Sequence, residues 1–390
     1  MSTLSPKAAA VLARDIYLIQ NPQMSNLLFS NPVFRQSSDK GVQVNKTLKS
    51  EVGGRIILNT KDNFGACALG GDKHPNDLFL LFRGTTTANN RADWLTDARI
   101  GISLSDSGIP VHSGFNHSFK SMLPDIKRFL GEHSKSIQNI HCVGHSLGGA
   151  VATLAADWAA RNTNNKVSLY TFGQPRVGTT IFSRSTTNKI GLENIYRSYH
   201  RTDPVPMVPL YPYVHAPHKD NGFFLPSNQP LASGEAHKMS NYVESVKGKS
   251  WEQLKSIVRE PYSVEIAIEN WLKSKSMVNP QSSAFWRWLD SALIYVLKKV
   301  AVTALVGLQS AFITGFTLAD KLAYILAKGI NLAENISIWV ELLIRKMAAA
   351  IGIKVKHKRE DITKSFIRRI LIQLTELATK TAKKAIQAIS

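Results

Sequence analysis

The sequence predicts an α/β fold with a central, mostly parallel sheet, followed by a basic helical C-terminal region. Residues 78–82 (Leu-Phe-Leu-Leu-Phe) are apolar throughout, which is typical of a strand covered on both faces. Residues 140–156 change from an apolar strand pattern, through a turn bounded by glycines, to a strongly apolar helix. Beyond residue 248 the apolar content stays high without strand-like runs, and no proline follows Pro280, which favours helices.

Length, charge and cysteine content narrow the class of protein. A chain of 390 residues can bury a sizeable core and form one large or two smaller domains. The formal net charge of +20 favours anionic partners such as lipid headgroups. The chain carries no nucleic-acid-binding signature, so we expect no nucleic-acid partner. Cys67 and Cys142 both lie in apolar strand-like runs, which predicts buried, reduced thiols.

The N-terminus shows no secretory signal pattern. An apolar run after Lys7 is interrupted by Arg14 and Asp15, and no small-residue cleavage site follows. We therefore expect synthesis in the cytoplasm without a signal peptide. The product would then be membrane-associated or exported by a non-classical secretion system.

The remaining elements of the first half follow from periodicity and turn residues. Ser5 and Pro6 predict the start of a helix over residues 4–20. The polar stretch 21–52 is predicted as a loop. The pattern then predicts strands at 54–58, 64–69, 78–82, 140–143 and 167–172, and helices at 118–133 and from the turn at 144–148 to about 161.

Residues 144–148 (Gly-His-Ser-Leu-Gly) stand between the strand and the helix, where a nucleophile elbow forms. Such a turn projects the Ser146 hydroxyl from the carboxyl end of the sheet, and Gly144 and Gly148 leave room for neighbouring backbone. The Leu147 amide would then face the oxyanion formed when Ser146 attacks a carbonyl. A Gly-x-Ser-x-Gly pattern also occurs by chance in ordinary loops. An acid and a histidine later in the chain therefore decide whether Ser146 is predicted as a nucleophile.

A second oxyanion donor is predicted after the strand 78–82. That strand continues into Arg83, Gly84 and Thr85, so the Thr85 amide and hydroxyl would lie beside the elbow. Taken alone, this segment would be interpreted as an ordinary Thr-rich turn.

Five motifs in order carry a resemblance to a known family. They occupy residues 82–85 (Phe-Arg-Gly-Thr), 93–97 (Asp-Trp-Leu-Thr-Asp), 111–115 (Val-His-Ser-Gly-Phe), 144–149 (Gly-His-Ser-Leu-Gly-Gly) and 171–178 (Thr-Phe-Gly-Gln-Pro-Arg-Val-Gly). The chain resembles the class 3 lipases over roughly residues 50 to 245. These α/β-hydrolases include fungal triacylglycerol lipases and plant phospholipases A1. The resemblance implies an α/β-hydrolase fold, lipid ester hydrolysis without a cofactor, and a lid over residues 86–97 in which Trp94 lines the acyl entrance.

The acid and the base should follow the nucleophile in the order Ser, Asp, His. Asp203 opens an Asp-Pro-Val-Pro segment after a strand-like run and matches the family's catalytic aspartate. His215, His218 and His237 are the candidate bases, and His237 matches the family's His-x-x-x-x-Tyr segment. His145 is expected to support the site from beneath the nucleophile.

The pattern around the other histidines does not indicate a catalytic or metal-binding role. His112 and His141 are interpreted as core or supporting residues. The histidine pairs at 112 and 117 and at 215 and 218 have no cysteine or carboxylate at ligand spacing, so no metal is expected.

The domain prediction is a hydrolase domain at 1–247 and a basic, amphipathic helical region at 248–390. Residues 285–390 carry 17 Lys and Arg against 7 Asp and Glu. Residues 300–319 are uncharged and just long enough to span a bilayer, although several are polar. Helices are predicted at 322–332, 336–351 and 362–389. Their apolar faces suit either a soluble helical cap or docking on anionic lipid, and docking is the preferred interpretation.

The functional prediction is a serine hydrolase of lipid carboxylic esters, most plausibly of phospholipase A type. The alternatives are an intracellular triacylglycerol lipase and a membrane-active protein that acts through its tail. A lipase-like chain with a basic tail and no signal peptide pattern also resembles the antibacterial lipase effectors of type VI secretion systems. That resemblance implies an inhibitory immunity protein as a partner.

Overall fold

The computed structural model describes residues 3–36, 43–52, 60–85, 101–218, 222–227, 229–255, 264–303, 318–355 and 361–387. Within these residues, seven strands form the central sheet in the order β1-β2-β3-β6-β7-β8-β9. The strands are β1 (Asn45–Val52), β2 (Thr60–Leu69), β3 (Asp77–Phe82), β6 (Asn139–His145), β7 (Lys166–Phe172), β8 (Ile195–His200) and β9 (Phe223–Leu225). A separate hairpin pairs β4 (Ile102–Leu104) with β5 (Pro110–His112).

The sheet is parallel from β3 to β9 and antiparallel only at the β1-β2-β3 edge. Helical crossovers connect the parallel strands, as their geometry requires. Parallel strands with crossover helices and a serine turn after β6 form an α/β-hydrolase fold, so the predicted fold class is confirmed.

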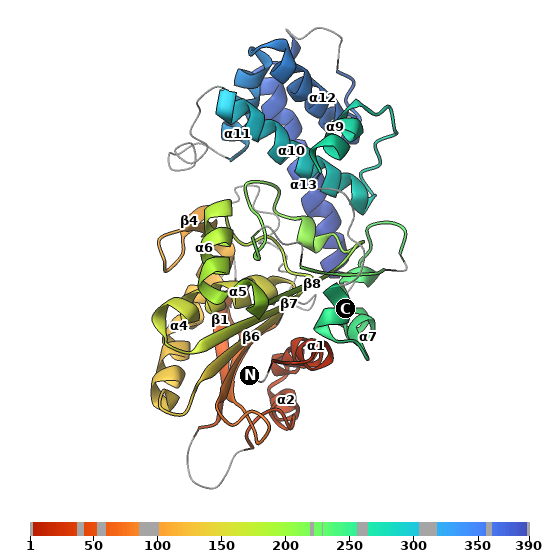
Figure 1. The fold of residues 1–390 in the computed structure, drawn as a ribbon. Helices are drawn as coiled ribbons and strands as arrows, with labels where there is room; N and C mark the ends of the chain where they lie inside the picture. Colours follow the sequence, from red (N-terminus) through yellow and green to blue (C-terminus); the bar gives the residue numbers. More distant parts are fainter. Residues whose placement is uncertain are drawn as a thin grey trace.

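Helices cover both faces of the sheet (Figure 1). One layer contains α4 (Ser113–His133), α5 (Leu147–Asn162) and α6 (Thr180–Ile190), and the other contains α1 (Pro6–Asp15) and α7 (Met239–Val246). Alternate residues of β3 point to opposite layers, so Leu80 packs with α4 and α5 while Leu81 packs with α1. This two-sided burial explains why the strand is apolar throughout.

Local signals confirm several predicted elements. The Ser5 hydroxyl accepts a hydrogen bond from the Ala8 amide and caps α1, which continues as the 3-10 helix η1 (Ile16–Gln20). Cys67 and Cys142 are buried free thiols, as predicted. The other short helices are η2 (Pro22–Met24), α2 (Ser25–Phe29), η4 (Leu192–Asn194), η5 (Val205–Met207), η6 (Glu235–His237) and α8 (Trp251–Lys255).

The prediction of a loop over 21–52 is wrong at both ends of that stretch. It contains α2 and the edge strand β1. The polar sequence of β1 did not predict a strand, because one face of an edge strand need not be apolar. Helix α4 starts five residues before the predicted 118, directly after β5. The predicted strand at 54–58 lies outside the described residues.

The C-terminal region contains α9 (Glu265–Lys273), α10 (Ser283–Thr303), α11 (Leu318–Ile330), α12 (Glu334–Ala350) and α13 (Lys364–Gln387). These helices share a hydrophobic cluster in which Ile370 and Leu374 of α13 are buried. The apolar stripe considered for membrane docking therefore packs inside the protein. Residues 304–317, most of the uncharged stretch 300–319, lie outside the described residues. Among the described helices, none combines the length and hydropathy that crossing a bilayer demands.

The helical region also packs on the hydrolase fold. Val205 and Val208, in and next to η5, belong to the same hydrophobic cluster as α13. Helix α13 contacts η5 and η6, as its long course toward the sheet in Figure 1 indicates. Arg176 Nη1, after β7, lies 2.7 Å from Asp290 Oδ1 of α10. The C-terminal helices thus buttress the loops that follow β8 and β9.

Candidate active site

Ser146 lies in a strained turn between β6 and α5. Its φ is 55° and its ψ is −130°, and it is the one non-glycine with positive φ among the described residues. An L-residue in this region costs about 1–3 kcal/mol, so the surrounding packing must impose the conformation. The Ser146 amide donates to the Phe172 carbonyl at 3.0 Å, which anchors the turn to the end of β7.

Glycines at 144 and 148 are sterically required. A Cβ on Gly144 would lie 2.3 Å from the Gly148 carbonyl oxygen, and a Cβ on Gly148 would lie 2.2 Å from the Phe82 carbonyl oxygen. The backbone of the serine turn therefore packs directly against the first turn of α5, and the first turn of α5 packs directly against the end of β3.

The structure brings Ser146, His237 and Asp203 together in one hydrogen-bonded chain. His237 Nε2 lies 2.9 Å from Ser146 Oγ, and His237 Nδ1 lies 2.7 Å from Asp203 Oδ2. All three side chains are buried. Because a carboxylate only accepts hydrogen bonds, Nδ1 carries the proton and Nε2 is left to accept the hydroxyl of Ser146. Each residue follows a different strand: β6, β8 and β9.

Asp203 is held by two further donors. The Tyr242 hydroxyl donates to Oδ2 at 2.7 Å, and the Val205 amide donates to Oδ1 at 2.9 Å. Burial, with the Asp203 charge beside it, raises the pKa of Tyr242 well above its usual value, so Tyr242 stays a donor. The carboxylate is thereby fixed in the orientation that the His237 ring requires.

A second chain of hydrogen bonds supports His237 through His145. The Gly84 amide donates to the Tyr17 hydroxyl at 3.0 Å, and that hydroxyl lies 2.7 Å from His145 Nδ1. His145 Nε2 lies 2.8 Å from the His237 carbonyl oxygen, which can only accept, so Nε2 carries the proton and Nδ1 accepts from Tyr17. Burial, with His237 nearby, lowers the pKa of His145 well below its usual value and keeps the ring neutral. This geometry matches the supporting position expected for His145.

Two backbone segments that carry the predicted oxyanion donors border Ser146. Leu147 is the first residue of α5. The N–H groups in the first turn of a helix have no helical carbonyl to donate to, so the Leu147 amide has no hydrogen-bond partner within α5. Gly84 packs directly on Ser146, because a Cβ at Gly84 would lie 2.8 Å from the Ser146 Cβ. Thr85 follows immediately and is buried. Trp94, predicted at the substrate entrance, lies outside the described residues.

The other candidate histidines have contacts that support the fold. His215 Nε2 lies 2.8 Å from the Pro206 carbonyl, and burial lowers the pKa of His215 well below its usual value. The His218 backbone amide donates to Thr187 Oγ1 at 2.8 Å. His112 stacks on Phe115, and burial lowers its pKa to about 4. In the described part of the chain, one group has metal-ligand chemistry (His74, Asp77 and His141), and it lies at the amino ends of β3 and β6.

Sequence reasoning missed Tyr17 and Gly173. Tyr17 is 128 positions from His145, and no local pattern links a helical tyrosine to a distant turn. Gly173 follows β7 with φ +57°, and a Cβ there would lie 2.6 Å from Asp203 Oδ2. The available signal was its place at the carboxyl end of a parallel strand, where α/β sheets assemble their sites.

Comparisons with known proteins agree with this geometry. Residues 79–212 match the family model described as "Lipase (class 3)". A secreted mono- and diacylglycerol lipase 1 of Fusarium solani is 33% identical over 165 residues, which cover 41% of this chain and 47% of the relative. The chloroplastic phospholipase A(1) DAD1 of Arabidopsis thaliana is 33% identical over 34% of each chain. Toxin TseL of Vibrio cholerae is 37% identical over 103 residues, 26% of this chain and 15% of that protein.

The chain spans about half the length of the curated relatives it matches. Among solved structures, a Rhizomucor miehei lipase propeptide complex is 23% identical, with a TM-score of 0.39, over 57% of this chain and 67% of that chain. The family match covers β3 to the loop after β8, including the serine turn and Asp203. Residues 79–212, about a third of the chain, are therefore similar to the class 3 lipases.

Proposed function

We propose that the protein hydrolyses carboxylic esters of lipids through a covalent acyl-enzyme on Ser146. The observation that carries this proposal is the buried hydrogen-bonded chain from Ser146 through His237 to Asp203. This arrangement raises the nucleophilicity of a hydroxyl that is otherwise a weak nucleophile at neutral pH.

The proposed reaction has two halves. Ser146 Oγ attacks the ester carbonyl while His237 Nε2 takes its proton, and Asp203 stabilises the resulting imidazolium. The Leu147 and Thr85 amides would hold the tetrahedral oxyanion. Its collapse breaks the ester bond, and His237 donates the proton to the departing alkoxide. Water then attacks the acyl carbonyl while His237 Nε2 takes its proton. The bond from the carbonyl carbon to Ser146 Oγ breaks, His237 returns the proton to Oγ, and the fatty acid leaves.

The proposed substrate is a phospholipid, cleaved as by a type A phospholipase. The charge of +20 favours an anionic interface, and Arg369, Lys380 and Lys384 are exposed on α13. The similarity to phospholipase A(1) DAD1 supports this substrate class. Mono- and diacylglycerols are the second candidate, because the Fusarium relative is named for them. Through the C-terminal helices, residues 248–390 would dock the lipase domain on the membrane.

An antibacterial role is the biological setting that we propose for this activity. It is supported by the similarity to toxin TseL, which is confined to a small part of that protein. A producing cell would then need an immunity protein that blocks Ser146. Expression of the chain in the bacterial periplasm should arrest growth if the role is correct, whereas normal growth with full enzyme present there would exclude it.

Fatty-acid release decides between the substrates. We expect the wild-type chain to release fatty acid from anionic phosphatidylglycerol vesicles faster than from a diacylglycerol emulsion. Release from diacylglycerol alone would replace the phospholipid assignment with the second candidate. Vesicle dye leakage that is equal in wild type and Ser146→Ala, without fatty-acid release, would instead support a membrane-active protein and contradict the enzyme proposal.

Gly173 provides a prediction about the alignment of the site. Gly173→Ala should lower kcat by about 100-fold, because the added Cβ displaces Asp203 and His237 and disfavours the positive φ. Gly131→Ala is the matched control, because a Cβ on this helical glycine has no neighbour within 4 Å. The check is steady-state hydrolysis of a soluble short-chain ester. Equal kcat values for the two variants would contradict the proposed alignment role.

A further inference from the structure

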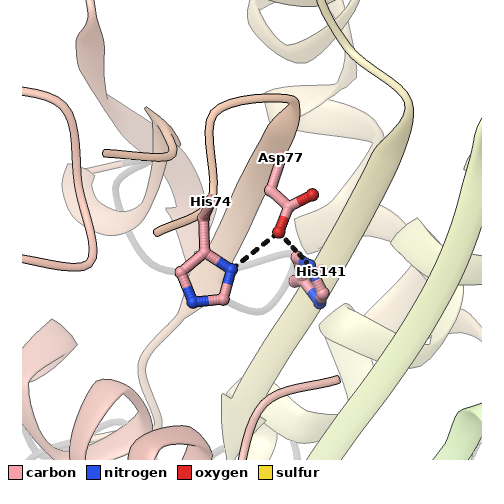
Figure 2. Close-up of side chains that lie close together, drawn as sticks. All are labelled: His74, Asp77 and His141. Atoms are coloured by element: carbon pink, nitrogen blue, oxygen red, sulfur yellow. Dashed lines mark hydrogen bonds and ion pairs between the residues drawn. The ribbon is translucent and has the colours of Figure 1, made fainter. Parts of the chain in front are cut away.

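His74, Asp77 and His141 form a compact cluster (Figure 2). The cluster lies at the amino ends of β3 and β6, whereas Ser146 follows the carboxyl end of β6. His74 belongs to the turn between β2 and β3, Asp77 begins β3, and His141 lies in β6. Both imidazoles point at one carboxylate oxygen: His74 Nδ1 lies 2.7 Å and His141 Nε2 lies 3.1 Å from Asp77 Oδ2. The proposed reaction uses none of these groups.

The spacing of the three atoms suits a small divalent ion. One ligand atom from each residue lies within 4.8 Å of the others. Zn²⁺ binds histidine nitrogen and carboxylate oxygen at about 2.0–2.1 Å, so tetrahedral ligand atoms stand roughly 3.3 Å apart. To reach that spacing, the separation of 2.7 Å between His74 Nδ1 and Asp77 Oδ2 would widen by roughly 0.6 Å, and the separation of 3.1 Å between His141 Nε2 and Asp77 Oδ2 by roughly 0.2 Å.

The surroundings hold the ligands as a metal site requires. The Asn139 side-chain amide donates to the other carboxylate oxygen of Asp77 at 2.7 Å, which orients the carboxylate from outside. The His141 ring is stacked on Phe79, with ring centroids 5.0 Å apart. Because the Asp77 carboxylate only accepts hydrogen bonds, His141 Nε2 carries the ring proton here, and zinc binding would move that proton to Nδ1, which is buried and has no hydrogen-bond partner among the described residues.

Access is possible from one side. Asp77 and His141 are buried, but the His74 side chain is 15% exposed. Two histidines and one carboxylate leave the fourth tetrahedral position for water, as in other zinc sites with three protein ligands. The charge of Asp77 would be balanced by the cation, and both imidazoles would bind in their neutral form.

We propose that His74, Asp77 and His141 bind one Zn²⁺ ion, which ties the β2–β3 turn to β6. We assign this ion to stability, although a water in its fourth position is otherwise typical of catalytic zinc sites, because it would lie far from the serine. Ser146 follows His141 by five positions, a separation of about 16 Å at the ordinary strand rise. Zinc would therefore stabilise the fold by binding the native state, and it would take no part in ester cleavage.

Zinc and cobalt binding to the full chain test this proposal. After treatment with a chelator, the wild-type protein should bind one Zn²⁺ per chain by calorimetry, and its Tm should rise by on the order of 5 °C in excess Zn²⁺. Co²⁺ should give the visible absorption of a tetrahedral site. His74→Gln should weaken zinc binding by more than about 100-fold. Asn139→Ala loses only the amide that orients Asp77 and should weaken zinc binding by about 10–100-fold.

His133→Gln is the matched control, because His133 is a surface histidine whose Nε2 lies 2.9 Å from the backbone carbonyl of Gln43. It should bind zinc as the wild type does. Far-ultraviolet circular dichroism verifies that each variant is folded, and Asp77→Asn replaces His74→Gln if the latter is not. No zinc binding to the chelator-treated wild type, or equal binding by wild type and His74→Gln, would overturn the site.

Discussion

Ser146→Ala is expected to lower kcat for ester hydrolysis by about 10⁶-fold, because it removes the hydroxyl that forms the proposed acyl-enzyme. The remaining rate would come from the oxyanion donors and substrate binding alone. The fold should survive, since the Ser146 amide keeps its bond to the Phe172 carbonyl and the side chain is merely shortened. Hydrolysis of a soluble chromogenic ester measures the loss.

Ser134→Ala is the matched control for this experiment. Ser134 is exposed at the end of α4, and its hydroxyl donates only to the Gly131 carbonyl. Its kcat should equal that of the wild type. If Ser146→Ala kept more than a small percentage of the wild-type rate, Ser146 would not be the nucleophile.

Asp203→Asn should lower kcat by about 10⁴-fold with little change in the structure. An asparagine carries no charge to stabilise the His237 imidazolium. If its amide nitrogen faces His237 Nδ1, it donates to that atom and moves the ring proton to Nε2, where it opposes the Ser146 hydroxyl. The Val205 amide can still donate to the side-chain oxygen, so the loop should keep its place.

Asp125→Asn is the corresponding control, because Asp125 lies on α4, where its carboxylate pairs with Lys46 at the surface. We expect wild-type kcat for this variant. A kcat for Asp203→Asn within about tenfold of wild type would assign the acid to another residue, since removal of the true acid costs far more.

Local chemistry explains which parts of the site could be predicted from sequence. The serine turn needs glycines at 144 and 148 on steric grounds, and this need leaves a recognisable pattern beside an apolar strand. Asp203 and His237 follow strands that end at the same edge, so chain order and motif resemblance were enough to select them. The structure brings these residues together, and their catalytic roles remain the proposal to test.

Contacts between distant segments explain what could not be predicted. The Tyr17 hydroxyl joins the Gly84 amide to His145, and only the packing of η1 against the sheet makes this bridge. Likewise, His74 and Asp77 meet His141 because β3 and β6 are neighbours, although 64 positions separate Asp77 from His141. Sequence spacing alone gave no reason to expect a metal there.

The C-terminal helices show a second property that the sequence does not predict, which is the surface that each apolar helix face contacts. Their amphipathic pattern indicated apolar faces, but a pattern does not say what covers a face. In the structure these faces pack on one another and on the η5 loop after Asp203. Basic residues such as Lys380 remain exposed, and the proposed docking on anionic lipid therefore depends on charge.

Covalent labelling tests the central claim most directly. A lipid-like fluorophosphonate reacts with an activated serine and leaves a stable adduct whose position peptide mass spectrometry can identify. We predict one adduct per chain on Ser146, a parallel loss of ester hydrolysis, and no labelling of Ser146→Ala. Full inhibition with the adduct on another residue, or active enzyme that stays unlabelled, would contradict an acyl-enzyme on Ser146.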